Sequence, residues 1–267
     1  MSGVYYVYLK VHVKGQEGNW ARFQLCFPSR YDADEFYRTL QVAQLVNPSS
    51  YIEGLVRTSP QFWCYSNSNW HHLVNIQRNG LVNEFRERII TTLLNDGDGG
   101  TRGFTIIPNP VTGPDWLDGG CFFIRNRRQP DQYWFVHNNH LHTSESRRDK
   151  FCITVSKPAT IRGHPQQRQP EGPLVLIRED SVTVSVVLET TASTTVTRDN
   201  KYISIENGRD CTSVLVVNHI PYVWKFGELM CRSIGVRWED ERDAYGRELP
   251  MPLLKPMTYG ADEWELC

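Results

Sequence analysis

The chain has 267 residues, with 29 Lys and Arg against 30 Asp and Glu, which gives a net charge of −1. Hydrophobic residues make up 40% and charged residues 22%, and these values exclude a disordered chain and a short disulfide scaffold. Because so small a net charge creates no overall field, we expect neither a nucleic acid nor a membrane as a partner. The unusual feature is the aromatic content of 8 Trp, 12 Tyr and 11 Phe.

The first hundred residues predict a small sheet with helices. Apolar and polar residues alternate over residues 4–13 and again over residues 21–27, which indicates two neighbouring strands. From Asp32 onward apolar residues recur at helical spacing until Pro48 ends the run, so we expect a helix packed on that sheet. Residues 20–46 resemble the end of a pleckstrin-homology-like domain, and the resemblance implies the same order of paired strands followed by a helix.

A second helix is predicted over residues 82–94, because four apolar side chains fall on one helical stripe: Val82, Phe85, Ile89 and Leu93. The glycine-rich run at residues 96–103 follows this stripe and ends it. We therefore place a domain boundary there and expect an α+β N-terminal region over residues 1–100.

Residues 101–235 have the pattern of an all-β region. Short apolar runs are separated there by Asn, Asp, Gly and Pro, which suits a trefoil or a barrel. The predicted strands span residues 121–125, 132–137, 151–155, 174–178, 182–188, 201–206, 213–217 and 222–226. Residues 236–267 contain three prolines and no strong periodicity, so we expect an extended C-terminal arm. The expected fold class is therefore α+β, mostly β.

Charge is distributed unevenly along the chain. Residues 122–171 hold nine Lys or Arg against four Asp or Glu, whereas residues 236–267 hold four against eight. We expect the acidic arm to fold back over the basic β region, since this would neutralise both. The alternative is that the basic residues form a patch for a phosphate-bearing ligand.

The most informative segment predicts a β-hairpin. Asn138 and Asn139 tolerate the positive φ of a two-residue turn, and this turn pairs residues 134–137 with residues 140–143 in antiparallel order. Alternation along the two strands then places five side chains on one face: Tyr133, Phe135, His137, His140 and His142.

Two uses of this face compete. A metal ion would need converging imidazoles and a further ligand, and no nearby Cys or Asp supplies one. Rings beside His and Asn side chains suit a carbohydrate or a flat organic ligand, because the rings supply apolar area and the polar groups direct hydrogen bonds. We therefore expect a carbohydrate or small-molecule ligand at this face, no metal and no cofactor. For Trp134 and Trp224 we expect core packing rather than contact with a sugar.

Residues 121–155 resemble one repeat of a β-trefoil, in particular the ricin-B-like or fascin-like modules of fungal lectins. The resemblance rests on the strand at residues 122–126, the Tyr133-Trp134 pair, the hairpin and the closing strand at residues 151–153. Residues 201–205 are similar to a second opening strand. The resemblance implies a trefoil fold and lectin-like binding of carbohydrate.

Non-covalent recognition of a carbohydrate or similar polar ligand by the hairpin face is thus the leading expectation. The alternative is a small cofactor-independent biosynthetic enzyme, a cyclase, isomerase or transferase, with a Trp- and Tyr-lined pocket and His or Glu acid–base groups. Its candidate groups are His71, His72, Glu84, Glu87, Asp115 and Asp118. None of the compact catalytic motifs of hydrolases, metalloproteases or nucleotide-binding enzymes occurs in the sequence.

The seven cysteines predict a reducing compartment. They are odd in number, widely spaced and free of any C-x-x-C pair, so we expect buried, reduced thiols. The N-terminus has the pattern of a strand rather than of a signal peptide. We expect a cytoplasmic protein, and the sequence leaves its oligomeric state open.

Overall fold

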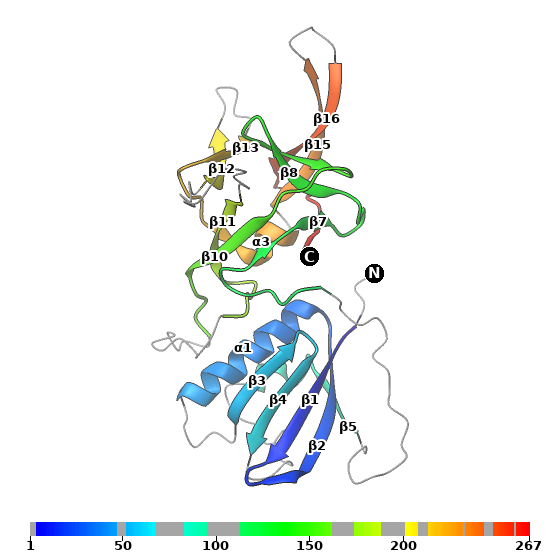
Figure 1. The fold of residues 1–267 in the computed structure, drawn as a ribbon, viewed down its shortest axis with the longest axis vertical. Helices are drawn as coiled ribbons and strands as arrows, with labels where there is room; N and C mark the ends of the chain where they lie inside the picture. Colours follow the sequence, from blue (N-terminus) through cyan, green and yellow to red (C-terminus); the bar gives the residue numbers. More distant parts are fainter. Residues whose placement is uncertain are drawn as a thin grey trace, which may run out of the picture. The chain divides into compact units, whose positions relative to one another are not determined.

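The computed structural model describes residues 4–46, 52–67, 83–94, 113–161, 174–187, 201–207, 213–231, 233–242, 248–258 and 260–267. This part of the chain is mostly β, with two sheets and two α-helices (Figure 1). The chain divides into two compact units. Unit 1 comprises Met1–Asp115 and Thr160–Ile177, and unit 2 comprises Trp116–Ala159 and Arg178–Cys267. This division differs from the three regions that we expected, with boundaries after residues 100 and 235.

Unit 1 contains a mixed sheet of five strands in the order β3-β4-β1-β2-β5 (Figure 1). The pair β1–β4 is parallel, and the other neighbouring strands are antiparallel. Its elements are β1 (Tyr5–Val13), β2 (Gln16–Phe27), α1 (Arg30–Val46), β3 (Glu53–Ser59), β4 (Phe62–Asn67), the 3-10 helix η1 (Asn83–Phe85) and β5 (Ile90–Leu94). The two predicted N-terminal strands and the helix after them are confirmed. The Ser29 hydroxyl accepts a hydrogen bond from the Asp32 amide at 3.3 Å, and this contact caps the start of α1.

The prediction of a helix over residues 82–94 is wrong. Its first residues form only η1, where Phe85 packs against Phe36 of α1 with ring centroids 5.2 Å apart. Residues 90–94, of which the first three are β-branched, form β5, which pairs with β2. Because Ile and Thr favour strands and β2 offers an unpaired edge, sheet pairing overrides the helical stripe. The glycine-rich run at residues 96–103 lies outside the described residues.

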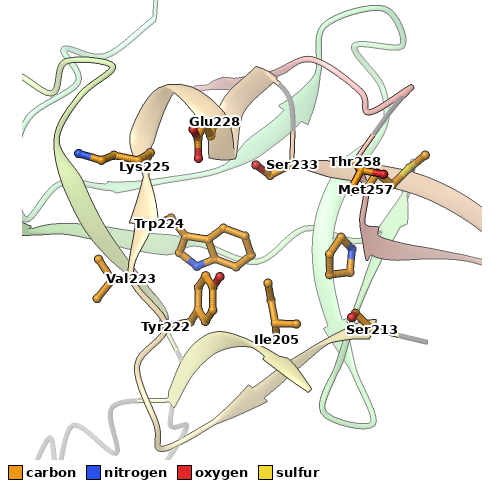
Figure 2. A pocket seen from close by; sticks show the side chains of 11 residues that line it. Ile205, Ser213, Tyr222, Val223, Trp224, Lys225, Glu228, Ser233, Met257 and Thr258 are labelled. Carbon is orange, nitrogen blue, oxygen red and sulfur yellow. The ribbon is translucent and has the colours of Figure 1, made fainter. Parts of the chain in front are cut away.

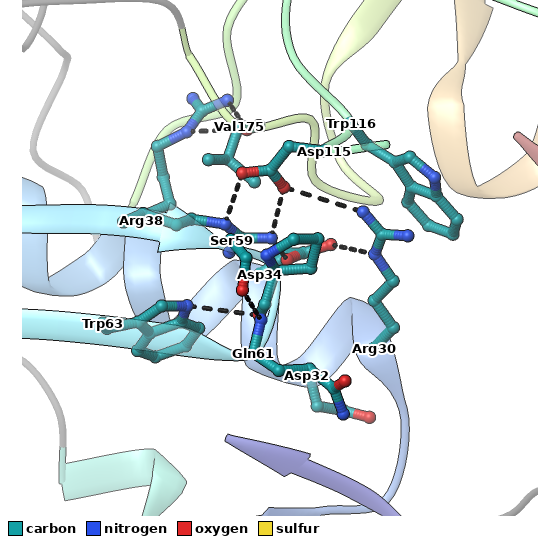
Figure 3. Close-up of polar contacts among 12 residues, drawn as sticks. Arg30, Asp32, Asp34, Arg38, Ser59, Gln61, Trp63, Asp115, Trp116 and Val175 are labelled. Carbon is teal, nitrogen blue, oxygen red and sulfur yellow. Dashed lines mark hydrogen bonds and ion pairs between the residues drawn. The ribbon is translucent and has the colours of Figure 1, made fainter. Parts of the chain in front are cut away.

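A buried ion cluster ties β3 to the start of α1 and to Asp115 (Figure 3). Arg57 of β3 donates hydrogen bonds to Asp34 at 2.7 Å and to both carboxylate oxygens of Asp115 at 2.6 and 2.8 Å. Arg30 lies 3.5 Å from the second oxygen of Asp34. Burial lowers the pKa of Arg57, but the charges and hydrogen bonds of the two carboxylates outweigh it and raise that pKa above its ordinary value.

Unit 2 contains the second sheet. Its elements are β6 (Cys121–Phe122), β7 (Ile124–Asn126), β8 (Tyr133–His137), β9 (His140–Ser144), β10 (Phe151–Lys157), β11 (Ser181–Val186), β12 (Lys201–Asn207), β13 (Ser213–Asn218), β14 (Trp224–Lys225), α3 (Phe226–Cys231), β15 (Ile234–Arg242), β16 (Glu248–Pro256) and β17 (Trp264–Leu266). The main path runs β17-β7-β8-β9-β13-β12-β11-β10-β6. The strand predicted at residues 174–178 is absent, and the one at 222–226 is reduced to β14. The trefoil or barrel stays a prediction.

The core of unit 2 is built around large rings. Trp134 is fully buried and meets Trp264 and Phe151 edge to face, at centroid distances of 5.2 and 5.8 Å. Trp224 is also buried, at 4% exposure. The prediction that Trp134 and Trp224 are core residues is confirmed, and edge-to-face contact is the arrangement that ring quadrupoles favour.

The C-terminal segment is not the extended arm that we expected. Strands β15 and β16 form a hairpin, β16 also pairs with β9, and β17 pairs with β7. Arg125 lies 2.5 Å from Glu265 and Arg127 lies 3.4 Å from Glu263, so acidic side chains of this segment do neutralise basic ones. Burial lowers the pKa of Arg125, but its bond to Glu265 raises that pKa above the ordinary value.

Two cysteines also differ from the expectation. Cys121 of β6 and Cys152 of β10 are direct cross-strand partners and form a disulfide. The prediction that all the cysteines are reduced is therefore wrong for this pair, and a cytoplasmic location stays a prediction. In the described part of the chain, no helix has the length and apolar character needed to cross a membrane.

Candidate functional site

The predicted hairpin is present with the predicted register. Asn138 and Asn139 form the turn with φ values of 51° and 60°, and β8 pairs with β9 so that Phe135 lies opposite His142 and His137 opposite His140. The local sequence suffices here, because Asn is among the few residues that adopt positive φ at low cost.

The face that we expected to bind a ligand is largely covered. Phe135 is 5% exposed and His142 is 1% exposed, and their rings lie 5.5 Å apart. Arg147 lies over the ring of Phe135 at 5.9 Å, and Arg148 lies over the ring of Tyr133 at 5.6 Å. In this conformation a ligand can therefore stack on neither Phe135 nor Tyr133 without displacing an arginine.

The remaining histidines lie at the end of the hairpin. His137 and His140 are half-buried, and each contacts Asn138, through the side-chain amide at 3.2 Å and the carbonyl oxygen at 3.0 Å respectively. Among the described residues no group of three His, Cys, Asp or Glu side chains is placed to hold a metal ion. The hairpin thus offers a few polar atoms at its rim rather than an open aromatic platform.

A better candidate is a pocket of about 470 Å³ in unit 2 (Figure 2). It lies where β12 and β13, the β14–α3 junction and the end of β16 meet. Its lining is Ile205, Ser213, Tyr222, Val223, Trp224, Lys225, Glu228, Ser233, Pro256, Met257 and Thr258. This volume falls within the range of about 300 to 1,000 Å³ typical of small-molecule sites.

The segment before β14 holds the aromatic wall of this pocket. The Asn218 side chain accepts a hydrogen bond from the Ile220 amide at 2.8 Å, which fixes the turn after β13. Pro221 follows, and the chain then presents Tyr222, whose side chain is 41% exposed although it is large and aromatic. Its ring packs on Trp224 with centroids 4.6 Å apart, so a buried ring supports an exposed one (Figure 2).

The junction between β14 and α3 is equally well fixed. The Phe226 amide donates to the Asp180 carbonyl and the Gly227 amide donates to the Arg178 carbonyl, both at 2.9 Å. A Cβ atom at Gly227 would lie 2.9 Å from the side chain of Arg178, so this close approach requires glycine. These bonds stop β14 after two residues and start α3, which carries Glu228 into the pocket lining.

The polar groups of the pocket supply both donors and acceptors. Glu228 provides a carboxylate, whereas the Lys225 side chain points away from the other lining residues (Figure 2) and its ammonium group donates to the Glu179 carbonyl at 2.8 Å. Besides Tyr222, three side chains add hydroxyls to the lining: Ser213, Ser233 and Thr258. A ring wall with hydroxyls and a carboxylate can hold a polyhydroxyl ligand by stacking and by directional hydrogen bonds.

The predicted acid–base groups are not gathered into one site. Two of them lie outside the described residues: His71 and His72. Two are exposed on or beside η1: Glu84 and Glu87. Asp115 binds Arg57, and the Asp118 carboxylate accepts a hydrogen bond from the Val155 amide at 2.7 Å. Both aspartates therefore hold the fold together.

Unit 2 is thus a β-rich unit with a pocket that is partly aromatic and partly polar. No protein-family model, no curated protein and no solved structure matches this chain. The sequence alone did not locate the pocket, because its walls come from segments far apart in the chain. One signal was available: Pro221 interrupts an apolar run at residues 220–224, and such an interrupted run can leave its first residues at the surface.

Proposed function

We propose that unit 2 recognises a carbohydrate or a similar polar, hydroxyl-rich ligand without covalent chemistry, and that it does so in the pocket beside Tyr222. The observation that carries the proposal is the exposed ring of Tyr222, supported by Trp224, at the wall of a pocket edged by hydroxyls and by Glu228. The resemblance of residues 121–155 to fungal lectin modules supports the same class of ligand.

The ligand is assigned to the pocket rather than to the hairpin face because of access. The hairpin rings are buried or lie beneath arginines, whereas the ring of Tyr222 is open. Sugar rings present patches of C–H groups that pack on an aromatic face and hydroxyls that need donors and acceptors around that face. The enzyme alternative is less well supported, because Asp115 and Asp118 are engaged in structural contacts.

A glycan array followed by titration calorimetry on the best ligand tests the proposal. We expect Tyr222→Ala to weaken binding at least about tenfold, since it removes the stacking surface, and Glu228→Gln to weaken it by a smaller factor. His140→Ala, at the end of the hairpin, is the matched control and should leave the affinity unchanged.

Two results would count against the proposal. One is an array without any ligand at high protein concentration. The other is a ligand whose affinity falls with His140→Ala and not with Tyr222→Ala, because that result would return the site to the hairpin face.

A further inference from the structure

The loop between β9 and β10 carries three exposed basic side chains, here called the loop cations: Arg147, Arg148 and Lys150. Neutralisation by the C-terminal segment, which we expected for the basic residues of this region, accounts for Arg125 and Arg127. It does not account for the loop cations, because no carboxylate in the described part of the chain forms an ion pair with any of them. For these three side chains the alternative, a patch for a phosphate-bearing ligand, remains.

The loop cations lie on aromatic rings of unit 2. Their distances to the ring centroids are 5.9 Å for Arg147 over Phe135, 4.7 and 5.6 Å for Arg148 over Phe123 and Tyr133, and 5.5 Å for Lys150 over Phe123. Two loop cations therefore share one ring, and all three are gathered on one side of the sheet. A guanidinium that lies on a ring keeps N–H groups directed outward in its own plane, so these donors stay available to an anion.

The backbone of this loop is fixed by hydrogen bonds of its own. The Ser144 hydroxyl accepts from the amides of Ser146 and Arg147, both at 3.2 Å. The Asp149 amide donates to the Trp134 carbonyl of β8 at 3.1 Å. Rings below and backbone bonds beside them hold the loop cations in place, which lowers the entropic cost of binding a ligand.

The two carboxylates of the same loop are engaged by other donors. Glu145 accepts a hydrogen bond from the Gln132 side-chain amide at 3.1 Å, and Asp149 accepts one from the Val136 backbone amide at 2.7 Å. The loop cations therefore lie together without a paired negative charge, and like charges in this arrangement repel one another. An anion bound among them would remove the repulsion.

The surroundings of the loop cations favour phosphate groups. The bases of a nucleic acid find no open ring here, because arginines already lie over Phe135 and Tyr133. The large apolar side chains that are exposed in the described residues belong to other segments than β6 to β10, so this region offers no apolar anchor for a peptide. Arginine forks pair with two phosphate oxygens at once, and three cations within four residues suit several negative charges in a small volume.

We propose that the loop cations of unit 2 bind a compact ligand with two or more neighbouring phosphate groups, either free in solution or as the headgroup of a lipid. Its oxygens would accept hydrogen bonds from the guanidinium groups of Arg147 and Arg148 and from the ammonium group of Lys150. The net charge of −1, from which we expected no anionic partner, averages over the whole chain and does not describe this loop. The site shares no residue with the pocket beside Tyr222.

Titration calorimetry of the full chain with inositol hexakisphosphate, tripolyphosphate and inorganic phosphate tests the proposal. We expect both polyphosphates to bind at least about tenfold more tightly than inorganic phosphate, since a single phosphate cannot engage all three cations at once. The affinity should fall as the salt concentration rises from about 50 to 200 mM, because the cations are exposed.

Vesicles distinguish the two sources of the phosphate groups. The protein is sedimented with phosphatidylcholine vesicles that contain or lack phosphatidylinositol bisphosphate. Retention by the bisphosphate vesicles alone supports a lipid headgroup, whereas binding of the free polyphosphates without retention supports a soluble ligand. Both results support the proposed chemistry.

Variants locate the site. Arg148→Gln should weaken polyphosphate binding at least about tenfold, because it removes charge-assisted hydrogen bonds, and Arg148→Lys by a smaller factor, because it keeps the charge and loses the planar fork. The matched control is Lys157→Gln, which removes an exposed lysine at the end of β10 and should change the affinity less than about twofold. These side chains are exposed, and a circular dichroism melt confirms that each variant is folded.

The carbohydrate proposal and this one fail independently. Tyr222→Ala should leave polyphosphate binding unchanged, and Arg148→Gln should leave sugar binding unchanged.

Three outcomes would overturn the phosphate site. The first is no heat of binding with either polyphosphate at about 1 mM ligand. The second is an equal loss of affinity in Lys157→Gln and Arg148→Gln, since this would mean that the ligand responds to net charge rather than to the loop. The third is a DNA duplex that binds more tightly than both polyphosphates and displaces them, because this would assign the loop cations to a nucleic acid.

Discussion

Replacing Arg57 by Met should strongly destabilise unit 1. The side chain of Arg57 is 3% exposed, and it is held by Asp34, which is fully buried, and by Asp115. Met keeps an unbranched aliphatic side chain but removes the charge, together with the guanidinium contacts to the rings of Tyr37 and Trp63 at 5.2 and 5.5 Å. Among the described residues, Arg30, 3.5 Å away, is then the one cation left to offset the desolvation of Asp34.

The expected loss of stability comes from the buried charge that is left without its counterion. Removing one partner of a buried ion pair typically costs about 3 to 5 kcal/mol, because the other charge stays buried without its counterion. Asp34→Asn should cost less, about 1 to 3 kcal/mol, since Arg57 keeps both bonds to Asp115. The double variant Arg57→Met with Asp34→Leu should be more stable than the sum of Arg57→Met and Asp34→Leu measured singly predicts, because it removes both members of the buried pair and leaves Asp115 beside Arg30 at 3.6 Å.

Urea unfolding followed by tryptophan fluorescence measures these differences. Lys14→Met is the matched control: Lys14 lies 2.6 Å from Glu53, but the two side chains are 66% and 53% exposed. An ion pair so open to solvent contributes at most about 1 kcal/mol. If Arg57→Met also costs less than that, the buried cluster does not hold β3 to α1 as we infer.

Three further predictions concern other parts of the molecule. Reduction of the Cys121–Cys152 disulfide, which spans 31 residues, should lower the free energy of unfolding of unit 2 by about 3 to 4 kcal/mol, measured by urea titration with and without reductant. Burial raises the pKa of Tyr37 from 10.0 to about 12, so the stability that its neutral form contributes should be complete below pH 10 and lost between pH 10 and 12. Parallel absorbance and circular dichroism titrations would refute this if the buried phenol ionised near pH 10 without unfolding. A Cβ atom at Gly235 would lie 2.1 Å from the sulfur of Met257, so Gly235→Ala should displace this pocket side chain and weaken ligand binding in calorimetry, while an unchanged affinity would show that the pocket does not depend on it.

The sequence predicts those elements of the fold that are determined by residues close together in the chain. The hairpin at Asn138 and Asn139 was predictable to the register, because a two-residue turn and strand alternation are local properties. Strand β5 was not, since residues 90–94 carry part of a helical stripe and only the edge of β2, far away in the sequence, makes them a strand. The local sequence pattern therefore gave the wrong secondary structure where pairing with a distant strand determines it.

The candidate site shows the same limit. Alternation correctly grouped the rings and histidines of the hairpin on one face, but it could not indicate that Arg147 and Arg148 lie over two of those rings. The pocket beside Tyr222 is built from four separate segments, and no single window of sequence contains its pattern of rings and hydroxyls. The residues were visible in the sequence, whereas their common location was not.

The exposure of individual aromatic residues, rather than their number in the sequence, indicates where a ligand could bind. Trp63, Trp134 and Trp264 are almost fully buried, and hydrophobic packing accounts for them. Phe62 and Tyr222 differ, because each is a large ring more than 40% exposed and supported from below by a buried ring. Phe62 packs on Tyr8 in the sheet of unit 1, whereas hydroxyls and the carboxylate of Glu228 lie beside Tyr222 in the pocket lining. The polar groups beside Tyr222 therefore support the proposal of a polyhydroxyl ligand in unit 2.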